Sequence, residues 1–323
     1  MKLAAGALLV LTFGSPALAQ TTSPPVTVVA NIAFHSDELM NLHHFLYAWA
    51  WYTRIEGRPL SQRLAAVPTA PFTPDERAAW DEAVRYYDRE LASKDLLFGE
   101  GMMAIKTALV AGRLDDAAIA PALRAVLESV RPSYRQLFWP EHDRVNRAWI
   151  ADIAGRVAGL RDDVVPQLER LYATTWFTTP ERADIVWVGN WAGGYASIGP
   201  THATISSTHP GTQGWEAAET VYHEYSHILI EGLSQKLNAA LGDGVKQHGV
   251  LWHVVQFYLT GEAVRAALAR RSITYEPSVV EMWGRAWPQY RQPVITAWAP
   301  YFEGRVTMDA AIANTVAALQ APK

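Results

Sequence analysis

The 323-residue sequence contains no cysteine, so the protein has no disulfide framework and depends on its hydrophobic core for stability. An excess of basic charge is equally absent, because 28 Lys and Arg residues stand against 32 Asp and Glu residues, for a formal net charge of -4. The basic residues are scattered along the chain. We therefore expect neither nucleic-acid binding nor electrostatic attachment to a membrane.

The N-terminal apolar run is too short to cross a bilayer. Ala4 to Phe13 is well under the roughly 20 residues that a spanning helix needs. Lys2 precedes this run, and Ala17-Leu18-Ala19 follows it as a small-x-small cleavage site. This order is typical of a secretory signal peptide. We predict that residues 1–19 are removed on export and that the mature chain is periplasmic or secreted, without a membrane span.

Hydrophobic residues make up 50% of the chain and charged residues 19%, enough to bury a large core. Residues 21–29 read as a linker or an early strand. Apolar spacings of three and four predict helices from residue 36 to 176, within a helical N-terminal region of residues 20–176. Strands are predicted at 184–188 and 195–206, followed by further helices. The sequence thus predicts a mainly α (α+β) fold, with helix breaks near Pro59, Pro68 to Pro74, Gly99 to Gly101, and Arg131-Pro132.

Two histidines and a glutamate stand close together in the stretch Val221 to Glu231, VYHEYSHILIE. A helix is predicted over Trp215–Gly232, and residues four apart lie on one helical face. His223 and His227 therefore present their imidazoles to a single point. Glu224 is placed to act as the general base towards a metal-activated water.

The pattern H-E-x-x-H is short and also occurs on ordinary surface helices, where two solvated histidines and a glutamate have no shared role. Its context favours a metal site. The chain carries an export signal, a strand is predicted just upstream, and apolar residues flank the motif on both sides.

Strands, a glycine-containing loop and then the motif helix resemble the zincin metallopeptidases over residues 184–270. The resemblance implies a Zn²⁺ ion, a peptide or protein substrate, and a small sheet packed beside the motif helix in a catalytic region of residues 177–323. In zincins the strand before this helix is the sheet edge, on which an extended substrate pairs. By resemblance, Gly193 to Ser197 lie at or near that edge; a simple hairpin turn at these glycines is the alternative.

A catalytic zinc ion usually has three protein ligands and one open position, so the motif needs a third ligand. The extended pattern H-E-x-x-H-x-x-G-x-x-H is excluded, because Ile230 stands at its glycine and Leu233 at its third histidine. The gluzincin branch of the family takes a glutamate from a second, downstream helix. The resemblance therefore points to Glu262, on a helix predicted over Lys246–Arg271.

His253 and Glu231 are the alternatives to Glu262 as third ligand. At about 100° per residue, His253 and Glu262 point to opposite faces of their helix, so both do not bind one ion. Glu262 is preferred because a carboxylate among small and apolar neighbours needs a charged or metallic partner. Glu231 is then an ordinary exposed carboxylate or a group beside the ligands.

Each of several further polar residues has two possible roles, one in function and one in packing. In gluzincins a tyrosine or histidine stabilises the oxyanion, and Tyr258, one turn before Glu262, is the candidate; a core tyrosine is the alternative. A role in the cleft or a role in packing is open for five histidines: His35, His43, His44, His202 and His209. Seven of the thirteen tryptophans fall in helical or strand patterns among apolar neighbours, which predicts core packing rather than carbohydrate binding. They are Trp49, Trp51, Trp187, Trp191, Trp252, Trp283 and Trp287.

The sequence thus predicts an exported, zinc-dependent metallopeptidase. The expected zinc ligands are His223, His227 and Glu262, the general base is Glu224, and Tyr258 is a candidate second catalytic group. Two alternatives stay open. One is a zincin-like envelope protein that binds metal or a partner without hydrolysis, and the other is a zinc hydrolase of a non-peptide amide or ester.

Overall fold

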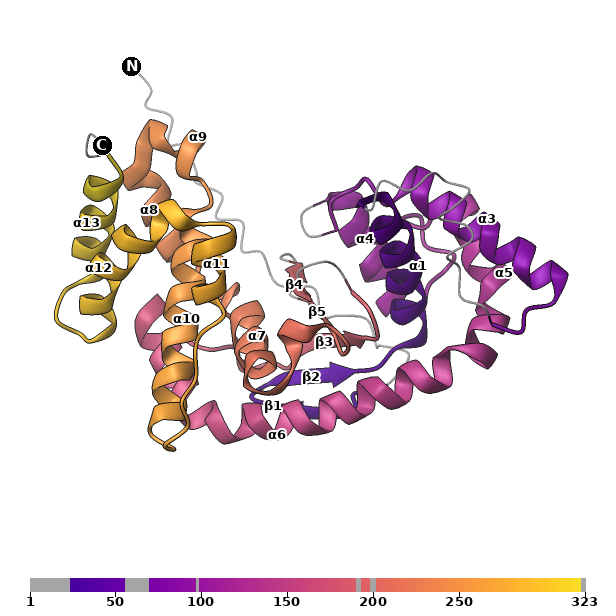
Figure 1. Ribbon diagram of the computed structural model, residues 1–323, viewed down its shortest axis with the longest axis horizontal. Coiled ribbons are helices and arrows are strands. Elements are labelled where there is room, and N and C mark those ends of the chain that lie inside the picture. Colours follow the sequence, from indigo (N-terminus) through magenta and orange to yellow (C-terminus); the bar gives the residue numbers. More distant parts are fainter. Residues whose placement is uncertain (1–23, 56–69, 97–98, 190–192, 198–201, 321–323) are drawn as a thin grey trace, which may run out of the picture.

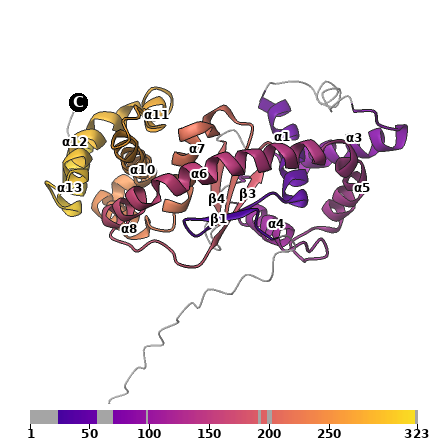
Figure 2. The same ribbon diagram turned by 90° about the horizontal axis from the view of Figure 1, so that it is seen from below.

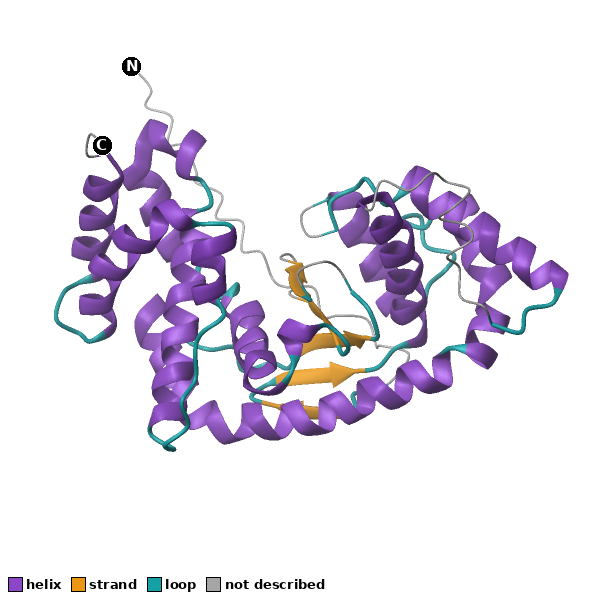
Figure 3. Ribbon diagram, viewed as in Figure 1, coloured by secondary structure: helices purple, strands orange, loops and turns teal. Residues whose placement is uncertain are grey.

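The computed structural model describes residues 24–55, 70–96, 99–189, 193–197 and 202–320. The chain is mainly helical with one small mixed sheet, so the predicted mainly α (α+β) class is confirmed (Figure 3). The predicted signal peptide lies outside the described residues, as do Pro59, Pro68 and Trp191. Within the described part of the chain, no helix combines the length and apolarity that crossing a membrane requires.

The sheet has five strands in the order β1-β2-β3-β5-β4. β2, β3 and β5 run parallel, and β1 and β4 pair antiparallel at the two edges. The stretch 195–206, predicted as one strand, contains parts of two strands that pair antiparallel, and residues 198–201 between them lie outside the described residues. The strands are β1 (Thr27–Val29), β2 (Ile32–His35), β3 (Glu181–Val186), β4 (Gly194–Ser197) and β5 (His202–Ser206).

β1 and β2 come from the N-terminal region, so the sheet is shared by the two regions that the sequence separates at residue 176. β2 was not predicted, because four buried residues in a row give no alternation of polar and apolar side chains. The first predicted strand, 184–188, is β3, which begins three residues earlier and ends at Val186.

Helices between β2 and β3 confirm the predicted helical region. They are α1 (Glu38–Ile55), α3 (Pro74–Glu90), α4 (Glu100–Val110), α5 (Pro121–Leu137) and α6 (Trp139–Tyr172). The break predicted at Arg131-Pro132 is wrong, since Pro132 lies inside α5. Pro132 has no N–H to donate to the backbone carbonyl of Glu128. Because Glu128 is exposed, water can bond this carbonyl instead, which lowers the free-energy cost of the missing helix hydrogen bond.

Helices after the sheet are α7 (Gly214–Ser226), α8 (Glu231–Leu241), α9 (Val245–His248), α10 (Leu251–Ala269), α11 (Val279–Arg285), α12 (Arg291–Phe302) and α13 (Met308–Gln320). The single helix predicted over 246–271 is two helices, α9 and α10. They separate at Gly249, where a methyl group would lie 2.9 Å from the carbonyl oxygen of Val245 and where glycine's low helix propensity favours a break.

The two groups of helices rise on either side of the sheet, and α6 runs beneath it from one group to the other (Figure 1). Seen from below, α6 passes across the strands of the sheet (Figure 2). α6 contacts β1 and β3 and also packs on α7 and α10. It therefore fixes the motif helix relative to the sheet.

The two faces of the sheet differ in chemistry. The face towards α6 and α7 is apolar and belongs to the larger core, with Ala183, Ile185, Ala203 and Ile205. The opposite face carries buried polar side chains among the residues of the second core: His35, Arg182, Asp184, Ser197, His202 and Thr204. Alternation along each strand separates these sets, because successive side chains point to opposite faces.

Candidate metal centre

The motif helix α7 ends at Ser226, one residue before His227, so the predicted helix over 215–232 is too long by about a turn and a half. Side chains compete for its last carbonyls. The carbonyl oxygen of His223 accepts hydrogen bonds from Ser226 Oγ, at 2.7 Å, and from Gln256 Nε2, at 3.0 Å. His227 keeps a right-handed helical conformation at the C-cap, so the i,i+4 relation of the two histidines survives.

Three histidines converge between α7 and α10. Nε2 of His223 lies 3.2 Å from Nε2 of His253, and one ligand nitrogen from each of His223, His227 and His253 lies within 4.8 Å of the others. α7 and α10 pack directly on each other. In the described ranges, this is the one group of three or more histidines and carboxylates whose ligand atoms come this close.

All three imidazoles are held uncharged. Burial lowers the pKa of His227 to about 3 and that of His253 to about 4, with His253 adding to the shift at His227. Burial and the two neighbouring rings hold the pKa of His223 well below its ordinary value. Neutral imidazoles each keep one nitrogen lone pair, which is the form that binds a metal.

Glu224 lies beside this cluster, with Oε2 3.9 Å from Nε2 of His227. Burial raises the pKa of Glu224 to about 8, against the lowering effects of the Lys106 charge and of a hydrogen bond from the backbone N–H of Ala196 on β4. Close approach of β4 depends on Gly194. A methyl group there would lie 3.0 Å from Cγ2 of Thr220 on α7, so a side chain at this position would crowd the strand against the helix.

Glu262, the expected third ligand, does not reach the histidines. Its carboxylate pairs with Arg265, with Oε1 3.1 Å from Nε of that residue, one turn along α10. The structure instead brings His223 and His227 together with His253. His253 is the alternative third ligand, and helical phase places it on the face of α10 opposite to Glu262. The charged partner that Glu262 required is a guanidinium and not a metal.

Tyr258 and Glu231 also lie apart from the histidines. Tyr258 is buried in the larger core, and its pKa is raised by burial and by the neighbouring Glu262 carboxylate. This burial agrees with the packing role that is one of the two interpretations of Tyr258. Glu231 is exposed at the start of α8 and accepts a hydrogen bond from Gln235.

One polar stripe on α10 explains which face meets α7. His253, Gln256 and Thr260 follow a spacing of three and four residues, and each contacts α7: His253 meets His223, Gln256 Nε2 donates to His223 O, and Thr260 Oγ1 lies 3.3 Å from Ser226 Oγ. Gln256 and Thr260 are fully buried. This stripe is the signal in the sequence that favours His253, because an otherwise apolar helix turns its polar side chains towards polar partners.

Aromatic rings surround the histidines. The Phe257 ring centroid is 3.8 Å from that of His223, Trp252 stacks on His253 at 5.0 Å, and Trp287 meets His253 edge-on at 5.9 Å. These aromatic residues are partly buried. They form an apolar shell that restrains the imidazoles and limits access of water.

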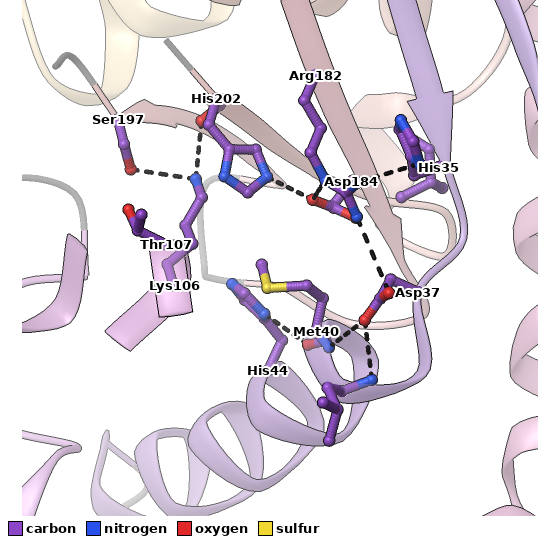
Figure 4. A network of polar contacts seen from close by, with 12 residues as sticks. His35, Asp37, Met40, His44, Lys106, Thr107, Arg182, Asp184, Ser197 and His202 are labelled. Atoms are coloured by element: carbon purple, nitrogen blue, oxygen red, sulfur yellow. Dashed lines mark hydrogen bonds and ion pairs between the residues drawn. The ribbon is translucent and has the colours of Figure 1, made fainter. Parts of the chain in front are cut away.

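The remaining candidate histidines do not join the cluster. His43 and His44 are fully buried on α1, where His43 Nδ1 bonds Tyr87 OH and His44 Nε2 bonds Tyr195 OH. His35 and His202 lie on the polar face of the sheet (Figure 4). His209 accepts a hydrogen bond from the backbone N–H of Gly211, in a one-turn 3-10 helix, Pro210–Thr212.

No protein-family model, curated protein or solved structure matches this chain.

Proposed function

We propose that the chain is an exported zinc-dependent hydrolase of peptide bonds, with His223, His227 and His253 as zinc ligands and Glu224 as the general base. The observation that carries the proposal is the convergence of three uncharged imidazoles beside a buried carboxylate. His253 takes the place that the family resemblance gave to Glu262. Three protein ligands with one further position is the arrangement of catalytic zinc sites.

The donor set suits zinc. Ligand nitrogens that lie 2.0–2.1 Å from a tetrahedral ion are separated by about 3.3 Å, and the Nε2 atoms of His223 and His253 are 3.2 Å apart. The Nδ1 atoms of His223 and His227 are buried without a hydrogen-bond partner in the part of the chain that is described. With the ring proton on Nδ1, each Nε2 offers its lone pair to the shared point.

A bound zinc ion would act as a Lewis acid towards the substrate carbonyl and lower the pKa of water towards about 7. Glu224 accepts the proton of the attacking water and passes it to the departing amine. Its carboxylate is positioned for both transfers by the Ala196 N–H and by the close approach of β4 at Gly194. A pKa raised towards neutral pH suits a group that must gain and lose a proton in each cycle.

A peptide substrate in extended form suits the edge strand. β4 pairs with β5 alone among the described strands, and its Ala196 N–H meets the carboxylate of Glu224. Addition of a substrate strand to β4 would bring a backbone amide next to the general base. This zincin-like use of the edge strand is the part of the proposal that distinguishes a peptide from a smaller amide or ester.

Three substitutions in the mature protein test the proposal. Glu224→Gln should keep stoichiometric zinc, measured by elemental analysis, and abolish chelator-sensitive cleavage of a mixed peptide library. His253→Ala should lose zinc and activity. Glu262→Gln, on the same helix, is the matched control and should keep both.

Full activity of Glu224→Gln would overturn the mechanism. Zinc retained in His253→Ala but lost in Glu262→Gln would restore Glu262 as the third ligand. Stoichiometric zinc with no turnover of peptides, esters or amides would favour a metal-binding envelope protein.

A further inference from the structure

Lys106 is a buried amine that the proposed mechanism leaves unused. It lies on α4, in the N-terminal group of helices, and is only 2% exposed. Its Nζ donates to Ser197 Oγ at 3.1 Å and to the carbonyl oxygen of His202 at 2.7 Å (Figure 4). The same Nζ lies 4.4 Å from the centroid of the Tyr195 ring. Lys106 therefore joins both strands at the open edge of the sheet to a helix about 90 residues earlier in the sequence.

The contacts of Lys106 are not those of a stabilising ion pair. Its hydrogen-bond partners are a hydroxyl and a carbonyl, while Asp184 and Glu224 act on it through longer-range charge. Burial lowers the pKa of Lys106 to about 7. An apolar side chain of similar volume would fill the same space at a smaller desolvation cost. Stability alone does not explain a lysine here.

β4 lies between Lys106 and the general base. Gly194 and Ala196 face α7, where the Ala196 N–H bonds Glu224. The side chains of Tyr195 and Ser197 point to the opposite face, because successive residues of a strand alternate, and there they meet His44 and Lys106. The strand that holds Glu224 from one side is thus held by Lys106 from the other.

The strand next to β4 is fixed by the same polar layer. His202, whose carbonyl accepts from Lys106, uses its ring Nε2 to bond Asp184 on β3. Asp184 is fully buried and accepts two further hydrogen bonds from Arg182, which also lies 3.9 Å from Asp37 at the start of α1. Lys106 is therefore a side-chain link between β4 and this anchored network, in addition to the backbone pairing of β4 with β5 (Figure 4).

We propose that Lys106 is a positioning residue for the reaction: by clamping Ser197 of β4 to the His202 carbonyl of β5, it holds the Ala196 N–H in register with Glu224. The expected effect on kcat rests on the proposed function, whereas the expected effect on the position of β4 rests on the structure alone. It makes the N-terminal helices part of the machinery of a site whose ligands all lie in the C-terminal half.

Lys106→Met tests this inference. In zinc-loaded protein, kcat should fall about tenfold while KM stays within about twofold, because a misplaced general base affects the chemical step more than binding. Ser197→Ala removes one of the two contacts and should give a smaller loss of kcat. Ser197→Ala also tests the inference if Lys106→Met fails to fold. Zinc content should remain stoichiometric in both variants.

Hydrogen–deuterium exchange gives a readout that needs no activity. The β4 peptide of Lys106→Met should exchange faster than in the wild type, while that of α7 does not change. Ile105→Ala is the matched control, since Ile105 is buried beside Lys106 on α4 and its truncation weakens the same helix. It should leave β4 exchange and kcat near wild-type values.

The outcomes separate the two proposals. Unchanged β4 exchange in Lys106→Met overturns the inference, with or without hydrolytic activity. Equal effects of Lys106→Met and Ile105→Ala on β4 and kcat overturn it as well, because helix stability would then be the cause. A wild-type protein that never hydrolyses peptides refutes the proposed function, and β4 exchange still decides the role of Lys106.

Discussion

Glu219 is a buried carboxyl group on the motif helix α7, one turn before His223, and its ionisation should contribute to the pH dependence of stability. It is 2% exposed and accepts hydrogen bonds from Tyr275 OH at 2.6 Å and from the Ser278 N–H at 3.1 Å. Burial raises its pKa to about 7, against these two hydrogen bonds and with a further increase from Glu216.

The sign of the effect follows from proton uptake. Between about pH 4.5 and pH 7 the folded protein keeps a proton on Glu219 that the unfolded chain has lost. The contribution of Glu219 to stability therefore falls as the pH rises through this window and levels off above it. A pKa difference between about 4.5 and about 7 gives a loss of about 2 kcal/mol from pH 5 to pH 8.

Glu219→Gln isolates this contribution, because the amide keeps an acceptor for Tyr275 and Ser278 but does not ionise. Urea unfolding with a metal chelator present, at pH 5, 6, 7 and 8, gives the free energy of unfolding of both proteins. The wild-type value minus the variant value should fall by about 2 kcal/mol across this range. Parallel curves for the two proteins would refute the reasoning, because titration of the other groups is common to both.

Further substitutions test three other contacts. Gln256→Leu removes the donor to the His223 carbonyl and should weaken zinc binding about 10- to 100-fold in chelator competition; an unchanged affinity would contradict an orienting role. Arg182→Met removes the guanidinium that donates two hydrogen bonds to buried Asp184 and should cost about 3–5 kcal/mol in urea unfolding. Adding Asp184→Leu should recover part of that loss, and an equal loss in the double variant would contradict the pairing. Gly194→Val should keep zinc and lose most hydrolysis, because its side chain crowds α7 and the general base; wild-type kcat would show that the close approach is not needed.

Much of the fold follows from local patterns in the sequence. The predicted helices between residues 36 and 176 and those after the motif are present, because apolar spacings of three and four need a common buried face. Strands were harder to predict. β2 is buried at all four positions, and the division of 195–206 into β4 and β5 depends on antiparallel pairing.

The residues of the candidate site also differ in whether the sequence alone predicts their position. His223, Glu224 and His227 were found because i,i+4 spacing on one helix determines their geometry without any knowledge of the rest of the chain. The third histidine depends on how α10 is turned about its own axis. Since α10 is buried on most sides, its hydrophobic pattern does not give that rotation, and the sequence prediction prefers Glu262 to His253, which the structure places at the cluster instead.

The sequence by itself determined the motif of His223, Glu224 and His227 and the apolar residues that flank it, since both are set by spacing within a few residues. Only the tertiary structure decided that His253 meets the motif, that Glu262 pairs with Arg265, and that Lys106 lies behind β4. These contacts depend on the packing of α4, α7 and α10 around one sheet. Packing of that kind is fixed by the shape of the whole core and not by any single stretch of residues.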